Sequence, residues 1–159
     1  MIHVRPATDS DADAISALWA EVQTVHAESL PDFFKPVSPN TFPPAEVREL
    51  LKQRQNVVLV ACEGPTVVGY ASAEVLERPG TPHRHPMTTL LVHAMGVSAN
   101  WRRRGAGRAL VEALRDAAKA KGIHSLLLDV WSFNSEARAF YQSVGFVSQR
   151  EYLSLDVDS

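Results

Sequence analysis

Two periodicities of hydrophobic residues run along the chain, and they separate strands from helices. Alternating positions or short apolar runs predict strands over residues 2–5, 57–62, 67–76, 87–97, 123–131 and 146–157. Apolar residues three and four positions apart predict helices that begin after Ser10, at Ala45, at Gly105 and at Asn134 or Ser135. Ser10 and Asp13 have the spacing of a capping box, and Gly122 and Gly145 stand where the last two helices should end.

The order of these elements predicts a mixed sheet covered by helices, in the α/β or α+β class. Antiparallel strands come first, and one β-α-β crossover follows, from the strand that ends at Val97 to the strand around Leu127. These two strands should be parallel neighbours, because a helix joins them. The leucine run at residues 126–128 is typical of a central strand that is buried on both faces.

Composition places the chain among ordinary globular proteins. The 159 residues suit one domain, 45% of them are hydrophobic, and the formal net charge of −2 disfavours a general affinity for nucleic acid or anionic membranes. The single cysteine, Cys62, excludes an intrachain disulfide and fits a reducing compartment, so we expect a cytoplasmic protein. No apolar run has the length of a signal peptide or of a membrane span.

A basic, glycine-containing loop separates the predicted strand 87–97 from the helix that follows. Gly105 and Gly107 let a ligand approach the backbone closely, and the helix N-terminus presents unpaired N–H groups with a partial positive charge. Four arginines surround these glycines: Arg102, Arg103, Arg104 and Arg108. The loop therefore predicts a pyrophosphate-binding site, although it lacks the Lys-Ser/Thr pair of a P-loop and the third glycine of a dinucleotide fingerprint. The alternative is a solvated basic turn before a helix.

The pattern Arg-x-x-Gly-x-Gly, at residues 102–107, resembles the acyl-CoA pyrophosphate loop of the GNAT family of N-acyltransferases. A second motif, at residues 134–146, resembles the family pattern of Asn, Ala, Phe-Tyr and Gly-Phe. The resemblance implies one N-acetyltransferase domain over residues 1–159, with a mostly antiparallel sheet of about six to seven strands flanked by about four helices. It also implies transfer of an acetyl group from acetyl-CoA to a primary amine of a small molecule, peptide or protein, directly within a ternary complex.

The resemblance assigns roles to individual residues. The implied cofactor-binding set is Met95, Gly96, Val97, Arg102, Arg103, Arg104, Gly105, Ala106, Gly107, Arg108, Asn134 and Tyr141. Within it, residues 102–108 would hold the pyrophosphate, residues 95–97 would pair with the pantetheine arm, and Asn134 would contact the pantetheine or the following turn. A bulge in the strand would direct an N–H group at the thioester carbonyl. Tyr141 would lie near the thioester sulfur as the general acid.

The general base has two candidates. In the family a glutamate often stands four positions before the valine that starts the loop, and here that position is His93. A histidine is a workable base near neutral pH, but a histidine in an apolar strand is more often a structural, hydrogen-bonded residue. Glu74, in the neighbouring predicted strand, is the second candidate. Tyr141 also has a structural interpretation, because it shares a helix face with Phe140 and Val144.

Two other functions are compatible with parts of the sequence. A non-catalytic acyl-CoA-binding module of the same fold would need the loop but neither Tyr141 nor a base. A nucleic-acid-binding domain would use the arginines, but no stacking aromatics flank them and the rest of the chain is acidic. His83 and His85 are not joined by a cysteine or carboxylate cluster, so we expect no metal site.

The acceptor-binding side is the part that the resemblance describes least. Its site should be built from the loops at residues 30–44 and 77–86 and from the C-terminal strand. Family members commonly end in two antiparallel strands, but few residues follow Gly145, so we expect one long strand or two very short ones. The identity of the amine stays open. Family members are often dimeric, which allows a homodimer here.

Overall fold

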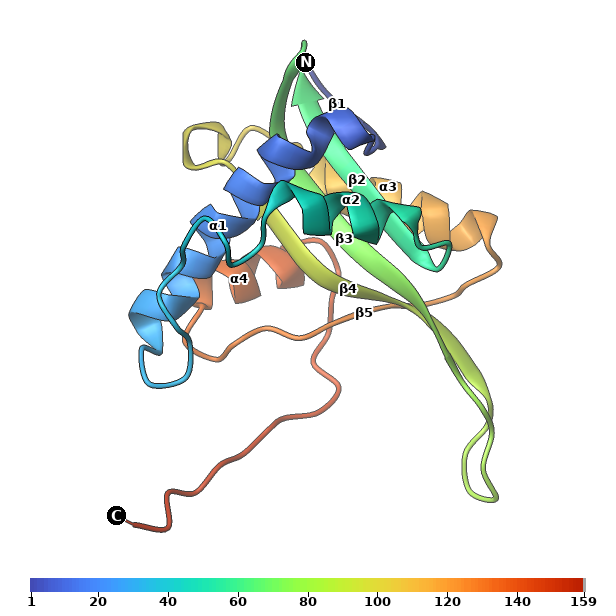
Figure 1. Ribbon diagram of the computed structural model, residues 1–159. Helices are drawn as coiled ribbons and strands as arrows, with labels where there is room; N and C mark the ends of the chain where they lie inside the picture. The colour runs from blue at the N-terminus through green and yellow to red at the C-terminus, as the bar shows by residue number, and fades with distance from the viewer. Residues whose placement is uncertain (159) are drawn as a thin grey trace. The chain divides into compact units, whose positions relative to one another are not determined.

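Five strands form one sheet whose spatial order is also their order along the chain (Figure 1). The structure, a computed structural model, describes residues 1–158. The strands are β1 (Ile2–Pro6), β2 (Asn56–Glu63), β3 (Thr66–Arg78), β4 (Met87–Val97) and β5 (Leu126–Leu128). Successive strands from β1 to β4 are antiparallel, and β4 and β5 are parallel. The chain divides into two compact units, Met1–Asp129 and Val130–Ser159, and each is described by itself.

Helices cover both faces of the sheet in the first unit (Figure 1). Helices α1 (Ala12–Ser29) and α2 (Pro44–Lys52) lie on one face, and α3 (Ala106–Ala120) lies on the other. The 3-10 helix η1 (Asp9–Asp11) precedes α1, and η2 (Ala99–Trp101) follows β4. Leu110, Leu114 and Ala118 recur at helical spacing in α3 and are buried, so this helix is stabilised by packing its apolar stripe on the sheet. The second unit contains α4 (Ser135–Ser143).

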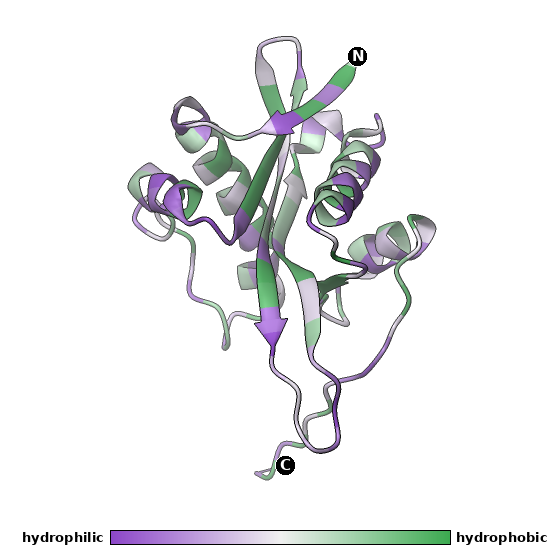
Figure 2. Cartoon of the chain, turned by 90° about the vertical axis from the view of Figure 1, so that its right-hand side faces the viewer, coloured by the Kyte–Doolittle hydropathy of each residue, from purple (hydrophilic) through white to green (hydrophobic). Residues whose placement is uncertain are grey.

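The hydrophobic core has one part on each face of the sheet. Leu59 and Ala71 face α3, whereas Val60 and Tyr70 face α1 and α2. Neighbouring residues of β2 and β3 thus pack in different parts of the core, because successive side chains of a strand point to opposite faces. Figure 2 shows the apolar strands between helices that carry polar residues on their outer sides.

The predicted fold class is confirmed, with two corrections. The strand that ends at Val97 and the strand at Leu126 are parallel neighbours in a mixed, mostly antiparallel sheet, as predicted. The predicted strand at residues 146–157 is wrong, because the described part of this segment contains no strand, and the sheet has five strands. The central, fully buried strand expected at residues 126–128 is also wrong. β5 pairs with β4 alone within the described sheet, and an edge strand this short leaves its three leucines only half-buried.

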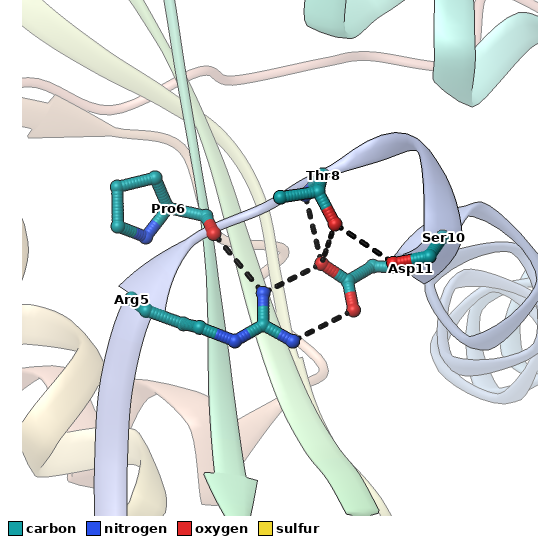
Figure 3. Close-up of polar contacts among 5 residues, drawn as sticks. All are labelled: Arg5, Pro6, Thr8, Ser10 and Asp11. Atoms are coloured by element: carbon teal, nitrogen blue, oxygen red, sulfur yellow. Dashed lines mark hydrogen bonds and ion pairs between the residues drawn. The ribbon is translucent and has the colours of Figure 1, made fainter. Parts of the chain in front are cut away.

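A buried carboxylate holds the junction between β1 and α1 (Figure 3). Asp11 is 4% exposed, and its two carboxylate oxygens accept hydrogen bonds from the Nη1 and Nη2 atoms of Arg5 at 2.7 and 2.9 Å. The Thr8 backbone N–H also donates to Asp11 Oδ2, at 2.8 Å. The capping box therefore joins Thr8 and Asp11, and the box predicted at Ser10 and Asp13 is wrong, because η1 moves the cap toward the N-terminus.

Asp11→Asn should lower the free energy of unfolding at neutral pH by about 1–3 kcal/mol, since it removes a buried charge that is hydrogen-bonded to Arg5 and to the cap. The Arg5 guanidinium, followed by the Thr8 N–H, lowers the pKa of Asp11 in the folded protein. This stabilisation is therefore complete above about pH 4, the ordinary aspartate range, and is lost as the pH falls through the folded pKa.

Denaturant unfolding at pH 7 and at lower pH measures both the loss and its pH dependence. The matched control is Asp13→Asn, which removes an exposed carboxylate from the first turn of α1. If both variants lose the same free energy of unfolding, the contacts of Asp11 with Arg5 and Thr8 do not stabilise the fold.

Candidate active site

β4 and β5 separate before β4 ends. Their last pair is Val92 with Leu128, whereas β4 continues to Val97. β3 accompanies β4 to its end, so β4 loses a neighbour only on the β5 side. On that side, no strand of the described sheet pairs with residues 93–97. Backbone groups in such a segment can pair with an extended ligand, and residues 95–97, the predicted pantetheine-binding segment, lie here.

The basic loop, residues 102–108, begins one short turn after β4. The Ser98 N–H donates to the Val68 carbonyl at 2.8 Å, and the Trp101 N–H donates to the Ser98 carbonyl at 2.8 Å, which fixes this turn. Gly105 then caps α3 with a φ of +90°, a left-handed conformation that favours glycine. No described side chain caps this helix, so the first N–H groups of α3 are available to an anion.

The four arginines of the basic loop are exposed, and the structure positions two of them. The Arg104 Cζ atom lies 5.0 Å from the centroid of the Trp101 ring, a cation–π contact. The Arg102 Nε donates to the Val97 carbonyl at 3.4 Å. Arg103 has a φ of +61°, a left-handed conformation that a non-glycine residue adopts at some cost. The loop thus concentrates positive charge beside the start of α3.

β4 contains the predicted bulge, and His93 is the extra residue. The pairing between β3 and β4 shifts by one position between Ser72 and Ala73, which leaves His93 without an opposite residue. The His93 Nε2 lies 2.7 Å from the Glu74 Oε2, and the two side chains are 49% and 34% exposed. The structure therefore joins the two candidates for the general base in one hydrogen-bonded pair, although the sequence presents them as alternatives.

The His93–Glu74 pair forms across the bulge, and Glu74 lies on the face of the sheet that α1 and α2 cover. Glu74 follows Tyr70 by four residues in β3, and Tyr70 packs in the core beneath these helices. Ser72 lies between them on the same face and is a buried polar residue, 6% exposed. The sequence did not single out Ser72, because a serine in an apolar strand carries no local signal of a site.

α1 fixes the end of β4 through two contacts that the sequence also does not reveal. The Glu21 Oε2 accepts a hydrogen bond from the Ala99 N–H at 3.1 Å. A Cβ atom added to Gly96 would lie 2.5 Å from the Val22 Cγ2, so α1 can approach the strand this closely only at a glycine. Glu21 and Ala99 are 78 positions apart, and no local pattern indicates that they meet.

In the second unit, Asn134 and Tyr141 lie at the start and near the end of α4. The Asn134 Oδ1 accepts a hydrogen bond from the Ala137 N–H at 3.1 Å, which caps the helix as predicted. The Tyr141 ring contacts the rings of Phe140 and Phe146, with centroids 5.4 and 5.6 Å away. Burial raises the pKa of Tyr141, so its hydroxyl stays protonated at neutral pH.

In residues 1–158, no group of three or more His, Cys, Asp and Glu side chains is arranged to hold a metal ion. His83 and His85 are exposed in the connection between β3 and β4, and Cys62 is a buried free thiol. None of the described helices combines the length and the apolar character that crossing a bilayer requires.

The fold and these motifs are those of a family of acetyltransferases. Residues 22–146 match the model of the acetyltransferase (GNAT) family, which is more than half of the chain. The chain therefore belongs to the GNAT family, as its two motifs predict.

Three proteins illustrate this relationship. The chain is 34% identical over 110 residues to N-alpha-acetyltransferase RimI of Mycobacterium tuberculosis, covering 69% of this chain and 64% of that protein. It is 40% identical over 52 residues to the ribosomal protein bS18-alanine N-acetyltransferase of Escherichia coli, covering 33% of this chain and 35% of that protein. Each alignment thus spans less than two thirds of the relative's length. The crystal structure of a mutant of the BH1408 protein from Bacillus halodurans is 26% identical, with a TM-score of 0.92, and covers 98% of this chain and 99% of that chain.

Proposed function

We propose that the chain is an N-acetyltransferase that transfers the acetyl group of acetyl-CoA directly to a primary amine in a ternary complex. The observation that carries this proposal is the open end of β4. The strand loses β5 as a neighbour after Val92 and leads through a short turn into a basic loop and a helix N-terminus. This arrangement offers a strand edge and an anion-binding site in sequence, which suits the pantetheine arm and the pyrophosphate of CoA.

Three parts of acetyl-CoA have a matching group in this region: the pyrophosphate, the pantetheine arm and the thioester carbonyl. The free N–H groups at the start of α3 and the arginines of the basic loop bind the pyrophosphate. The pantetheine arm pairs with residues 95–97 as an added strand. The His93 bulge departs from regular pairing, and we assign to it the N–H group that stabilises the oxyanion at the thioester carbonyl.

His93 is the proposed general base, and Glu74 orients it. When the imidazole is neutral, its Nε2–H donates to the Glu74 carboxylate across the 2.7 Å contact, and Nδ1 keeps a lone pair. Nδ1 takes a proton from the attacking amine, and the carboxylate stabilises the imidazolium that results. The exposed fraction of His93, 49%, leaves its ring within reach of a substrate or of a water that relays the proton.

Tyr141 is the proposed general acid. The amine nitrogen forms a bond to the acetyl carbonyl carbon, and the carbon–sulfur bond then breaks. The departing CoA thiolate takes the proton of the Tyr141 hydroxyl, which recovers it from solvent after release. The raised pKa of Tyr141 supports this role, because the hydroxyl carries its proton throughout the neutral range.

The acceptor is a primary amine of a small molecule, peptide or protein. The names of the two relatives above, an N-alpha-acetyltransferase and a ribosomal protein alanine acetyltransferase, favour the α-amine of a polypeptide. Such an amine has an ordinary pKa near 8, so a base of modest strength can deprotonate it at neutral pH.

An amine panel that follows the release of free CoA tests the proposal. Peptides with a free N-terminal alanine should release CoA from acetyl-CoA, whereas the same peptides with a blocked N-terminus should not. Small polyamines and aminoglycosides complete the panel. Acetyl-CoA that stabilises the protein without release of CoA to any amine would support the alternative, a non-catalytic acyl-CoA-binding module.

His93→Gln should lower kcat/KM at neutral pH by about 10- to 100-fold, because glutamine keeps a hydrogen bond but cannot take up a proton. The loss should be smaller near pH 9, where more of the amine is already deprotonated and needs no base. Initial rates from pH 5.5 to 9 measure the change.

His124→Gln is the matched control, since His124 is an exposed histidine next to β5. Glu74→Gln should reduce the rate less than His93→Gln, because the carboxylate acts through the imidazole. Full activity of His93→Gln would make His93 a structural polar residue, and a larger loss in Glu74→Gln would make the carboxylate the base.

A further inference from the structure

The hairpin of β3 and β4 extends beyond the rest of the sheet in the first unit (Figure 1). The pairing of β2 with β3 reaches Glu74, and the pairing of β5 with β4 begins at Leu90. Residues 76–78 and 87–89 lie beyond these two points, so no strand of the described sheet pairs with their outer edges. α3 ends at Ala120, close to the place where the hairpin loses its neighbours.

An open cleft lies between this part of the hairpin, the turn after α3 and the chain just before β2. Its volume is about 620 Å³, within the range of ~300–1,000 Å³ that is common for small-molecule sites. Val75 and Ile123 give it an apolar lining, since both pack against the core beneath α3 and Ile123 is only 5% exposed. Every lining residue belongs to Met1–Asp129, so the first unit forms the cleft by itself.

Three charged side chains line the cleft: Arg54, Glu77 and Lys121. All three are exposed, and in the part of the chain that the structure describes none of them forms an ion pair. On the nearby helix α2, by contrast, Lys52 pairs with Glu49 at 2.8 Å. Opposite charges that line one cleft without contacting each other leave a positive and a negative position for a ligand that carries both charges.

A second hollow adjoins the cleft along the hairpin. It has a volume of about 550 Å³, shares Glu77 and Thr88 with the cleft, and is also lined by Pro79, Pro86 and Met87. The Met87 residue is 52% exposed. Because proline and methionine side chains present apolar surface, an apolar group that enters this hollow is removed from water. A ligand that is held by the charges of the cleft can therefore extend an apolar group along the hairpin.

We propose that the cleft binds a zwitterionic α-amino acid with a large apolar side chain. Arg54 and Lys121 bind its carboxylate, and Glu77 binds its ammonium group. The side chain of the ligand lies against Val75 and extends toward Met87. A ligand with only negative charge would be repelled by Glu77, and one with only positive charge by Arg54 and Lys121. A molecule that carries both charges gives all three side chains a partner.

This site is separate from the candidate active site. α3 has 15 residues, so the cleft at its C-terminal end lies roughly 20 Å from the basic loop at its N-terminal end. No residue that lines the cleft is assigned to acetyl-CoA or to the transfer reaction. The proposal therefore does not depend on the proposed enzymatic function, and either of them can fail without the other.

Titration of the isotope-labelled full chain with L-phenylalanine, followed by the NMR chemical shifts of its backbone amides, tests the site. The amides of Val75, Glu77 and Ile123 should shift together, with one dissociation constant of about 1 mM or lower. N-acetyl-L-phenylalanine lacks the ammonium group, and L-phenylalaninamide lacks the carboxylate. Each should bind at least about 5-fold more weakly, because each loses its ion pairs with one side of the cleft.

Substitutions then assign each charge of the ligand to its partner. Glu77→Gln should weaken the binding of phenylalanine about 5-fold and leave the binding of N-acetylphenylalanine unchanged, because that molecule has no ammonium group to lose. Lys121→Gln should weaken the binding of phenylalanine by a similar factor and leave that of phenylalaninamide unchanged. The matched control is Lys119→Gln, which removes an exposed lysine of α3 that does not line the cleft. Since these side chains are exposed, the remaining amide shifts should show an unaltered fold.

Four results would overturn the proposal. The first is a titration in which the amides of the cleft do not shift, and the second is equal affinity for phenylalanine and its two one-charge analogues. The third is a Glu77→Gln protein that binds N-acetylphenylalanine as much more weakly as it binds phenylalanine, or a Lys119→Gln protein that loses as much affinity as Lys121→Gln. The fourth is a set of shifts confined to His93 and its neighbours, which would place the amino acid at the candidate active site as an acceptor.

Discussion

Gly107→Glu is expected to raise the dissociation constant of acetyl-CoA at least about 100-fold without unfolding the protein. Gly107 is the second residue of α3, where the free N–H groups of the helix are proposed to bind the pyrophosphate. A glutamate there would place a side chain and a negative charge in the position of the phosphates. The helix itself should tolerate the change, because glutamate has a higher helix propensity than glycine.

Titration calorimetry measures this affinity, and the thermal shift on adding acetyl-CoA should disappear in the variant. Ala120→Glu is the matched control, because it adds the same charge to the exposed, opposite end of the same helix. Normal affinity in a folded Gly107→Glu protein would mean that the basic loop does not bind the pyrophosphate.

Tyr141→Phe is expected to lower kcat by about 100-fold while the affinity for acetyl-CoA stays normal. Phenylalanine keeps the ring and its contacts with Phe140 and Phe146, and only the hydroxyl is lost. Because burial raises the pKa of Tyr141, the acid form should persist to an alkaline pH above the ordinary tyrosine value of about 10. The unaltered protein should therefore keep its proposed activity until the pH exceeds that value.

Single-turnover rates separate this chemical step from binding and release. Tyr152→Phe removes a hydroxyl from a residue that is 91% exposed and serves as the control. A Tyr141→Phe protein with normal kcat and a lower melting temperature would show that Tyr141 is a core residue and that another group protonates the thiolate.

The bounds of an element were predictable where they depend on residues that are close together in the sequence. The strand at residues 87–97 has the predicted bounds, because its apolar run ends at a clear change of composition before the basic loop. The helix ends were also predictable, since Gly122 and Gly145 adopt φ values of +69° and +105°, which glycine allows. The C-terminal segment was not, because its alternation predicts a strand at residues 146–157, but alternation alone does not supply a neighbouring strand to pair with, and the described residues of this segment form none.

The sequence by itself therefore determined the family, the fold class and the position of the basic loop, because these depend on neighbours along the chain. The tertiary structure alone decided that His93 meets Glu74, since this contact depends on a one-residue shift between β3 and β4. It also decided that α1 packs directly against Gly96, because the distance between two elements depends on how their side chains pack. Strand register and packing distance arise between segments that are remote in sequence, and no local pattern encodes them.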